Sequence, residues 1–352
     1  MKLYQKYLIR NYLKNFFVIF VALEFFYLGI DLLTTYQKLP KSANLQILYT
    51  MFESLYAINF VLPLSVIFAM IATTVSMIKS NELVSLRALG VSRQSFTLPI
   101  FFSALAIIVI YISLTFTPFS YAREYSVNIL QHNQISTNTE GLFLKNNNDY
   151  IYFEKFYPIK KEASHIKIYH VQDMDLQYVL KAQKGYYQEK NWVLYHVEKI
   201  IKPKAETLDG KGLIIQKFSK LETLKDFRPK IIDNIYKGKT NLSVLDAMDA
   251  LKFFNAQGLD TNRLKTIILS QLFIPLFAPL LILIFSSRTP LISRYYNTTL
   301  ISFVLIFISL ATWGLLFLFS KLAMNTVILP EVAIIIPMLS LGIFSLYSHF
   351  KE

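Results

Sequence analysis

The chain contains no cysteine among its 352 residues, and this absence excludes several kinds of chemistry. Disulfide bonds, thiolate zinc sites and a cysteine nucleophile are all ruled out. An exported domain would therefore have to be stabilised by its hydrophobic core alone. Charge is also scarce, because Asp, Glu, Lys and Arg make up 17% of the residues whereas 54% are hydrophobic. Such a composition is too apolar for an ordinary soluble domain and predicts membrane-spanning segments.

The motifs of common hydrolases are missing as well. The sequence holds neither a His-Glu-x-x-His zinc-protease helix nor a Gly-x-Ser-x-Gly nucleophile elbow. The five histidines are not spaced as metal ligands, so no metal and no cofactor is expected in this chain. No base-reading motif accompanies the net charge of +13, and a nucleic-acid partner is not expected. These residues indicate no enzymatic activity.

Six apolar runs reach the length of about 20 residues that a helix needs to cross a bilayer. We predict spans near residues 15–36, 55–78, 97–119, 265–285, 298–320 and 330–348. No small-residue cleavage site follows the first run, so we expect it to remain as a membrane helix. Four basic residues precede it, which predicts cytoplasmic N- and C-termini and an outside location for the segment between spans three and four. These residues are Lys2, Lys6, Arg10 and Lys14.

We predict that the segment 121–240 forms a β-domain inserted between two sets of three helices. Strand-like stretches lie at 149–154, 165–171, 176–182, 192–198 and 213–218. Breaks are expected at Lys184-Gly185 and at 189–191, and several short strands of this kind indicate a sandwich or jellyroll. In the following segment, 241–262, a capping box at Ser243 predicts a helix to about Ala256, which Gly258 would end. We expect this helix at the outer membrane surface, before the last three spans in 263–352.

A short polar-edged stretch, residues 80–90, separates the second and third apolar runs. Ser80 or Asn81 can cap a helix there, Glu82 lies in its positive first turn, and Gly90 suits the position after its end. Leucines at every third position would give it one apolar face. These are Leu83, Leu86 and Leu89. About three turns are too few for a stable isolated helix in water, so the segment has to dock on something.

Two carboxylates lie in the first predicted span. Glu24 and Asp31 are seven residues apart, which is two helical turns and about 10 Å along one face. An ionisable side chain within a membrane is costly and is by default a functional hypothesis. The other predicted spans carry no Lys or Arg at depth. Glu24 is therefore neutral, hydrated by a cavity, or paired with another subunit, whereas Asp31 is alternatively a residue of the outer interface.

The stretch from Lys79 to Ser92 resembles the cytoplasmic coupling segment of the LptF/LptG permeases, whose pattern reads roughly (K/R)-x-x-E-(L/M)-x-x-(L/M)-(R/Q)-A-x-G-(V/F/M)-(S/T). The order of three spans, a β-rich insert and three spans is also similar to that family. Gly141-Leu142-Phe143 resembles the start of the family's β-jellyroll, and Leu242-Ser243 resembles the segment that enters the fourth span. Gly29-Ile30-Asp31 looks closer to LptG than to LptF.

The resemblance implies a polytopic α-helical protein of the bacterial inner membrane, with six transmembrane helices and an inserted periplasmic β-jellyroll. Residues 1–120 would hold the first three spans. Family members are paired permeases of an ABC machine that extracts lipopolysaccharide, with one LptF and one LptG on a dimer of the LptB ATPase. The chain itself would be no enzyme, because ATP and Mg²⁺ would bind the ATPase. LptC and LptA-like jellyroll proteins would receive the lipid.

Two other interpretations remain open. One is an ABC-type mechanotransmission protein, which moves a periplasmic domain without carrying lipid. The other is a membrane-anchored sensor or scaffold, which has no ATPase partner.

The resemblance also assigns roles to particular residues. Contact with the ATPase would be made by Asn81, Glu82, Leu83, Val84, Leu86, Arg87, Ala88 and Gly90, while the first and fifth spans would line the lipid cavity and its gate. Two family features are missing: no cation follows Asp31 until Lys38, and Gln271 stands where a lysine is usual. The candidates for the lipid path are therefore Glu24, Asp31, Lys38, Lys41, Arg263, Lys265, Trp313 and Lys321.

Overall fold

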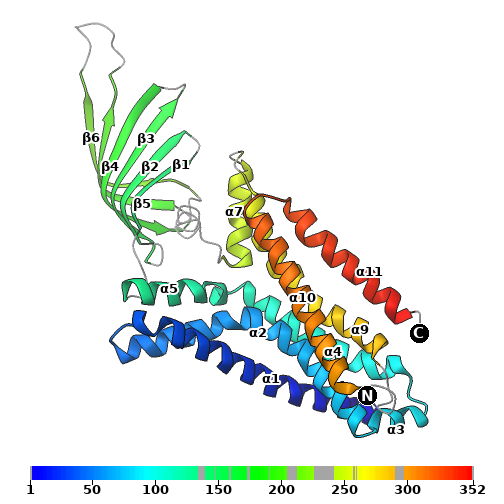
Figure 1. Ribbon diagram of the computed structural model, residues 1–352. Coiled ribbons are helices and arrows are strands. Elements are labelled where there is room, and N and C mark those ends of the chain that lie inside the picture. Colours follow the sequence, from blue (N-terminus) through cyan, green and yellow to red (C-terminus); the bar gives the residue numbers. More distant parts are fainter. Residues whose placement is uncertain are drawn as a thin grey trace. The chain divides into compact units, whose positions relative to one another are not determined.

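The computed structural model forms two compact units, one helical and one built on a β-sheet (Figure 1). The helical unit comprises Met1–Gln131, Ser243–Asn255 and Leu259–Glu352, and the sheet unit comprises His132–Leu242 and Ala256–Gly258. The structure describes residues 2–133, 139–146, 148–157, 160–172, 175–189, 191–203, 212–225, 242–256, 258, 260–289 and 297–350. The expected domain limits at 240 and 241 lie outside these ranges.

Six helical segments within the described ranges are long and apolar enough to cross a membrane, which confirms the predicted spans. They are α1 with η1 (Leu3–Thr35, Tyr36–Lys38), α2 (Ala43–Lys79), α4 (Arg93–Thr115), α8 to α9 (Asn262–Phe273, Ile274–Leu276 as η3, Phe277–Arg288), α10 (Thr298–Met324), and η5 with α11 (Glu331–Ile335, Ile336–Phe350). The first two helices begin about a dozen residues before the predicted spans, because hydrophobicity marks the part of a helix that lies in lipid and not its ends.

The third membrane helix ends earlier than expected. After Thr115 the chain forms a short 3₁₀ turn, η2 (Pro118–Tyr121), and then α5 (Ala122–His132). Pro118 lacks an N–H and occupies the first turn of η2, while the Thr117 hydroxyl accepts a hydrogen bond from the Phe119 N–H at 3.3 Å. Residues 121–131, which were expected in the inserted domain, thus belong to the helical unit.

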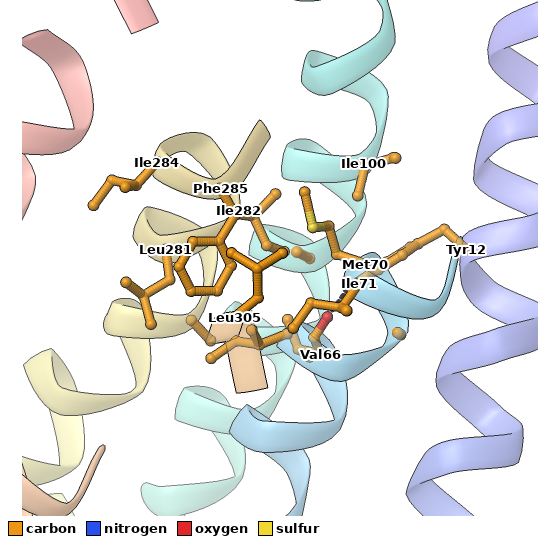
Figure 2. Close-up of a cluster of buried hydrophobic side chains, with 14 of the residues drawn as sticks. Tyr12, Val66, Met70, Ile71, Ile100, Leu281, Ile282, Ile284, Phe285 and Leu305 are labelled. Carbon is orange, nitrogen blue, oxygen red and sulfur yellow. Dashed lines mark hydrogen bonds between the residues drawn. The ribbon is translucent and has the colours of Figure 1, made fainter. Parts of the chain in front are cut away.

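The core of the helical unit centres on α2, α4 and α9. Val66 and Met70 of α2, Ile100 of α4 and Ile282 of α9 are fully buried (Figure 2). By contrast, α1 and α10 keep long rows of exposed apolar side chains, including Phe25, Phe26, Phe303 and Phe307. Such surfaces suit lipid or a partner helix and do not suit water. The central helices are therefore fixed by packing, and the outer ones remain open to their surroundings.

The sheet is an antiparallel meander whose six strands are neighbours in chain order. The strands are β1 (Thr139–Asn146), β2 (Asp149–Tyr157), β3 (Glu162–Gln172), β4 (Asp175–Gln188), β5 (Asn191–Ile201) and β6 (Ile214–Thr223). All five predicted strands lie within these strands, except that β6 begins at Ile214, one residue after the predicted start at 213. Together with the six membrane helices, this sheet confirms the predicted fold class of a helical membrane protein with an inserted jellyroll-like domain.

The predicted break at Lys184-Gly185 is wrong. Strand β4 continues through both residues, and the chain turns only after Gln188. A Cβ on Gly185 would lie 2.5 Å from Ile166 Cδ1 and 2.8 Å from Leu194 Cδ2. The glycine is thus required by close packing within the sheet rather than by a turn.

One face of the sheet carries an aromatic core. The Trp192 side chain is fully buried, and its ring centroid lies 5.4 Å from that of Phe153 and 6.0 Å from that of Phe156. Rings at these separations contribute about 0.5–1.5 kcal/mol per pair beyond the burial of their area. This cluster provides the stabilisation that a cysteine-free domain cannot obtain from disulfides.

The helix predicted after the β-domain is present as α7 (Val244–Ala256). The Asp246 N–H donates to Ser243 Oγ at 3.2 Å, and Ser243 Oγ donates to the Asp246 carboxylate at 2.8 Å. The carboxylate therefore bonds to the cap hydroxyl and not to the cap backbone, which is a variant of the expected box. Gly258 takes φ +66°, the left-handed conformation expected of a residue that ends a helix.

Candidate functional site

The stretch 80–90 contains a short helix, α3 (Glu82–Ala88). Its C-terminus is a Schellman motif: the Gly90 N–H donates to Arg87 O at 2.9 Å and the Val91 N–H donates to Leu86 O at 3.1 Å, with Gly90 at φ +81°. This matches the role expected for Gly90. The expected side-chain cap is wrong, because Asn81 occupies the N-cap position at φ +60° without a side-chain hydrogen bond.

The two faces of α3 differ in burial. Leu83 is 3% exposed and packs in the core of the helical unit, with Leu86 partly buried against the same core. Leu89 is 81% exposed, so the predicted face of three leucines is wrong at its third member. Leu89 follows the last helical residue as the C-cap, where the helical period no longer applies. Val84 is exposed too, which leaves an apolar surface on the far side of the helix.

A hydrogen bond links α3 to the first membrane helix. The Tyr7 hydroxyl of α1 donates to Glu82 Oε2 at 2.9 Å. The remaining residues predicted to contact the ATPase are exposed: Asn81, Arg87, Ala88 and Gly90. Helix α3 is therefore docked on the helical unit through Leu83 and Glu82 and presents its other residues outward.

The helices α1 and α2 lie side by side and are joined by a ladder of polar contacts (Figure 1). Glu24 accepts a hydrogen bond from Ser54 at 2.8 Å, and Asp31 accepts one from Tyr49 at 2.5 Å. Further along, Asn15 donates to Thr73 at 2.8 Å. Hydrogen bonds between membrane helices stabilise their packing by about 0.6 kcal/mol each on average. Both carboxylates predicted on one face of the first span thus face α2 of the same chain.

A groove lies beside Glu24. It measures about 790 Å³ and is lined by α1 and the first half of α2, mostly with apolar side chains such as Phe25, Leu28 and Met51. The second carboxylate oxygen of Glu24 is buried and has no hydrogen-bond partner among the residues that the structure describes. Glu24 therefore places a carboxylate in a groove that is otherwise mostly apolar.

An ion pair between α2 and α5 was missed by the sequence analysis. Arg123 Nη1 lies 2.7 Å and 2.8 Å from the two carboxylate oxygens of the fully buried Glu53, to which Tyr27 also donates at 3.2 Å. Burial by itself lowers the pKa of Arg123. The neighbouring Glu53, Tyr56 and Tyr27 together raise it by more than burial lowers it, so the pKa of Arg123 lies above its ordinary value. In the sequence, Glu53 lies just before the predicted span 55–78, and Arg123 lies just after the predicted span 97–119. Two opposite charges beside spans, on the same side of the membrane, could have indicated this ion pair.

The other candidates for the lipid path are distributed over several elements. Lys38 and Lys41 are exposed around the α1–α2 connection, and Arg263 is exposed on α8. Lys265 pairs with Glu331 at 3.1 Å, so its charge is already compensated. On α10, the Trp313 ring lies 6.3 Å from Phe60 of α2, and Lys321 Nζ lies 5.2 Å above the ring of Phe317. The structure thus joins α10 to α2 but does not gather the cations into one cluster among the described residues.

Comparison with known proteins places the chain in a family. No curated protein shows significant similarity to the sequence. A family model described as "Lipopolysaccharide export system permease LptF/LptG" matches residues 6–349. The match does not separate LptF from LptG, so the closer likeness to LptG stays a prediction. With nearly its whole length matched and six membrane helices, the chain belongs to the LptF/LptG family of lipopolysaccharide export permeases and is a multi-pass protein of the inner membrane.

Proposed function

We propose that the chain is one of two permease subunits of an ABC transporter, which extracts lipopolysaccharide from the inner membrane and passes it to a periplasmic bridge. The second permease would be its LptF or LptG counterpart, a dimer of LptB would hydrolyse ATP, and LptC and LptA-like proteins would form the bridge. The N- and C-termini would be cytoplasmic and the sheet unit periplasmic. The observation that carries this proposal is the two-faced helix α3.

The exposed side of α3 has the chemistry of a helix that fits a groove. Val84 and Leu89 are 39% and 81% exposed, and Arg87 lies between them in sequence. Apolar anchors beside a charge are the usual contacts of a short helix in a partner's groove. A surface of this kind at the cytoplasmic side would meet the ATPase.

The buried side of α3 gives such contact a route into the membrane helices. Leu83 packs in the same core as α2 and α9, and Glu82 is bonded to Tyr7 of α1. A rigid shift of α3 would therefore displace α1, which also carries Glu24 and lines the apolar groove. Rigid-body movement of packed helices is a common form of coupling. We infer that α3 acts as a lever between ATP hydrolysis and the lipid path.

Three substitutions test the lever. Val84→Asp places a charge on the exposed face and should abolish co-purification with the ATP-hydrolysing subunit. Tyr7→Phe removes only the bond to Glu82 and should preserve assembly while lowering lipopolysaccharide-stimulated ATPase activity. Glu82→Ala should partly reduce both the co-purification and the lipopolysaccharide-stimulated ATPase activity. The matched control is Ser85→Ala, which lies on the same exposed surface. Normal assembly and coupling in Val84→Asp would refute the proposal.

The lipid path needs its own test, because an ABC-type mechanotransmission protein would share the lever but carry no lipid. Photocrosslinking groups at Phe25 or Met51 in the α1–α2 groove, or at Trp313, should capture lipopolysaccharide. Neutralising two or more of the exposed cations should lower lipid-stimulated ATPase activity, with Lys38, Lys41, Arg263 and Lys321 as the substitutions. An absence of crosslinks together with unchanged stimulation would favour mechanotransmission.

Membrane topology is testable with single cysteines, because the chain has none of its own. A cysteine at Ser85 should react with membrane-impermeant maleimide only after the inner membrane is opened. One at Lys181, on the exposed side of the sheet, should react in intact spheroplasts. The reverse pattern would contradict the proposed orientation.

A further inference from the structure

The alternation of buried and outward side chains in the sheet is interrupted along one line across four successive strands, which we call the crease. In each of these strands two adjacent residues that are exposed or half-exposed are flanked by buried ones. These pairs are Glu154-Lys155, Ser164-His165, Gln183-Lys184 and Tyr195-His196. The register places them beside one another across β2 to β5. Successive side chains of a strand normally alternate between the two faces of the sheet, and two outward residues in a row break this alternation. The crease therefore concentrates side chains on the solvent-exposed face of the sheet, which we call the outer face.

Alternate strands cross the crease through a residue in the left-handed conformation. Gly141 of β1 has φ +66°, His165 of β3 has φ +51° and His196 of β5 has φ +53°. Glycine adopts such angles freely, whereas a residue with a Cβ is strained by them. Strand β1 uses the unstrained solution, and the other two strands carry imidazoles instead. Strain that a glycine would relieve points to a use for the side chain.

Both histidines line the same groove on the outer face, which measures about 530 Å³. Lys167, Lys181 and Lys217 line it as well, with Glu198 as its carboxylate. Lys167 and Lys181 are direct cross-strand partners, an arrangement that is unfavourable for like charges without a counter-charge. Glu198 faces Lys181 in register and lies 3.3 Å from Lys217, so it compensates only part of the positive charge.

We infer that this groove binds the phosphate group of a phosphorylated ligand. Lysine ammonium groups bind phosphate as point charges, and imidazole N–H groups add directed donors. Strands β3 and β5 are two spacings apart, about 10 Å, so the two imidazoles would flank an anion bound between them from opposite sides. A metal ion does not fit instead, since no group of three or more His, Asp or Glu side chains in the described ranges could hold one.

The charged groups around the two imidazoles favour an anion. Charged groups on the outer face around His165 are Glu154, whose carboxylate lies 3.7 Å from Nδ1, together with Lys155, Lys167, Lys181 and Lys184. Those around His196 are Lys181, Lys184, Glu198, Lys217 and Lys220. In each set four lysines accompany one carboxylate, so the surroundings of both imidazoles are net positive.

The test uses the full chain in phosphatidylcholine nanodiscs. Inorganic diphosphate at a fixed pH measures phosphate binding. In the double variant His165→Gly/His196→Gly, diphosphate binding should weaken about tenfold or more, the loss of one or more charge-assisted hydrogen bonds. The unfolding temperature should stay the same or rise, because glycine suits the positive φ. His132→Asn, outside the sheet, is the matched control.

Two further arms complete the design. Lys181→Gln should weaken diphosphate binding and reduce its salt dependence, which separates the ligand site from a purely structural role of the histidines. Flotation with phosphatidylglycerol vesicles distinguishes lipid-borne phosphate from free phosphate: a loss in the double variant assigns the site to lipid headgroups, and a loss of diphosphate binding alone assigns it to soluble ligands. If the double variant binds diphosphate and phosphatidylglycerol vesicles as strongly as the natural chain does, the inference is overturned.

Discussion

Replacing Arg123 with methionine tests the ion pair that joins α5 to α2. Glu53 is fully buried and receives both of its short contacts from Arg123 Nη1, at 2.7 Å and 2.8 Å. After the substitution only the Tyr27 hydroxyl, at 3.2 Å, would still donate to the carboxylate. Breaking a buried pair from one side costs about 3–5 kcal/mol. Since 35% of the Arg123 side chain is exposed, water offsets part of this, and we expect a loss of about 3 kcal/mol.

The measurement is the free energy of unfolding in mixed micelles for four proteins: the natural chain, Arg123→Met, Glu53→Gln and the double variant. The double variant should be more stable than Arg123→Met, because it leaves no buried charge without a partner. The double-mutant cycle should then give a coupling energy of about 2 kcal/mol or more. Additive losses, or a cost below about 1 kcal/mol for Arg123→Met, would refute the reasoning.

Three smaller changes test single contacts by the same unfolding measurement. Gly185→Ala should lose about 1–3 kcal/mol through overpacking against Ile166, whereas Gly212→Ala, with no atom within 4 Å of its Cβ, should be nearly neutral. Tyr49→Phe should lose about 0.6–1.7 kcal/mol by removing the donor to Asp31, and a neutral result would mean that the bond is absent in the membrane. Gly90→Ala should lose about 1–2 kcal/mol, since the Schellman motif holds position 90 at φ +81°; an unchanged stability would contradict that backbone.

The parts of the fold that could be predicted are those set by local composition. Apolar runs of about 20 residues located the six membrane helices of the described residues, since a helix in lipid satisfies its backbone hydrogen bonds within a single segment. Alternation located five of the strands, and turn chemistry located Gly90 and Gly258, where a left-handed residue ends a helix. In each case the physical cause acts within a few neighbouring residues, so the sequence contains it directly.

The parts that could not be predicted depend on contacts between distant residues. Gly185 was interpreted as a turn because glycine is common in turns, and only the positions of Ile166 and Leu194 show that it is needed for packing. The crease could not be foreseen either, because two outward residues in one strand resemble a loose alternation. The pattern becomes evident only when β2 to β5 are aligned by their hydrogen bonds.

The candidate site shows the same division. The sequence indicated that residues 80–90 form a docked helix, and the structure adds that Leu83 and Glu82 dock on the helical unit itself. The sequence could not, however, distinguish a carboxylate that is paired within the chain from one that is not. Glu53, unremarked in the sequence, has a guanidinium and a tyrosine hydroxyl as partners, whereas Glu24, singled out from the sequence, has one serine.

The contrast between these two carboxylates bears on function. A carboxylate whose oxygens are all bonded within the chain has already exchanged water for protein partners, so its burial is explained by structure alone. Glu53 meets this condition through Arg123 and Tyr27. Glu24 does not, because its second oxygen has no partner in the described part of the chain and adjoins an apolar groove of about 790 Å³. An unmet acceptor at depth is costly unless a partner arrives. Of the two, Glu24 is therefore the carboxylate whose burial is not explained by its contacts within the described part of the chain.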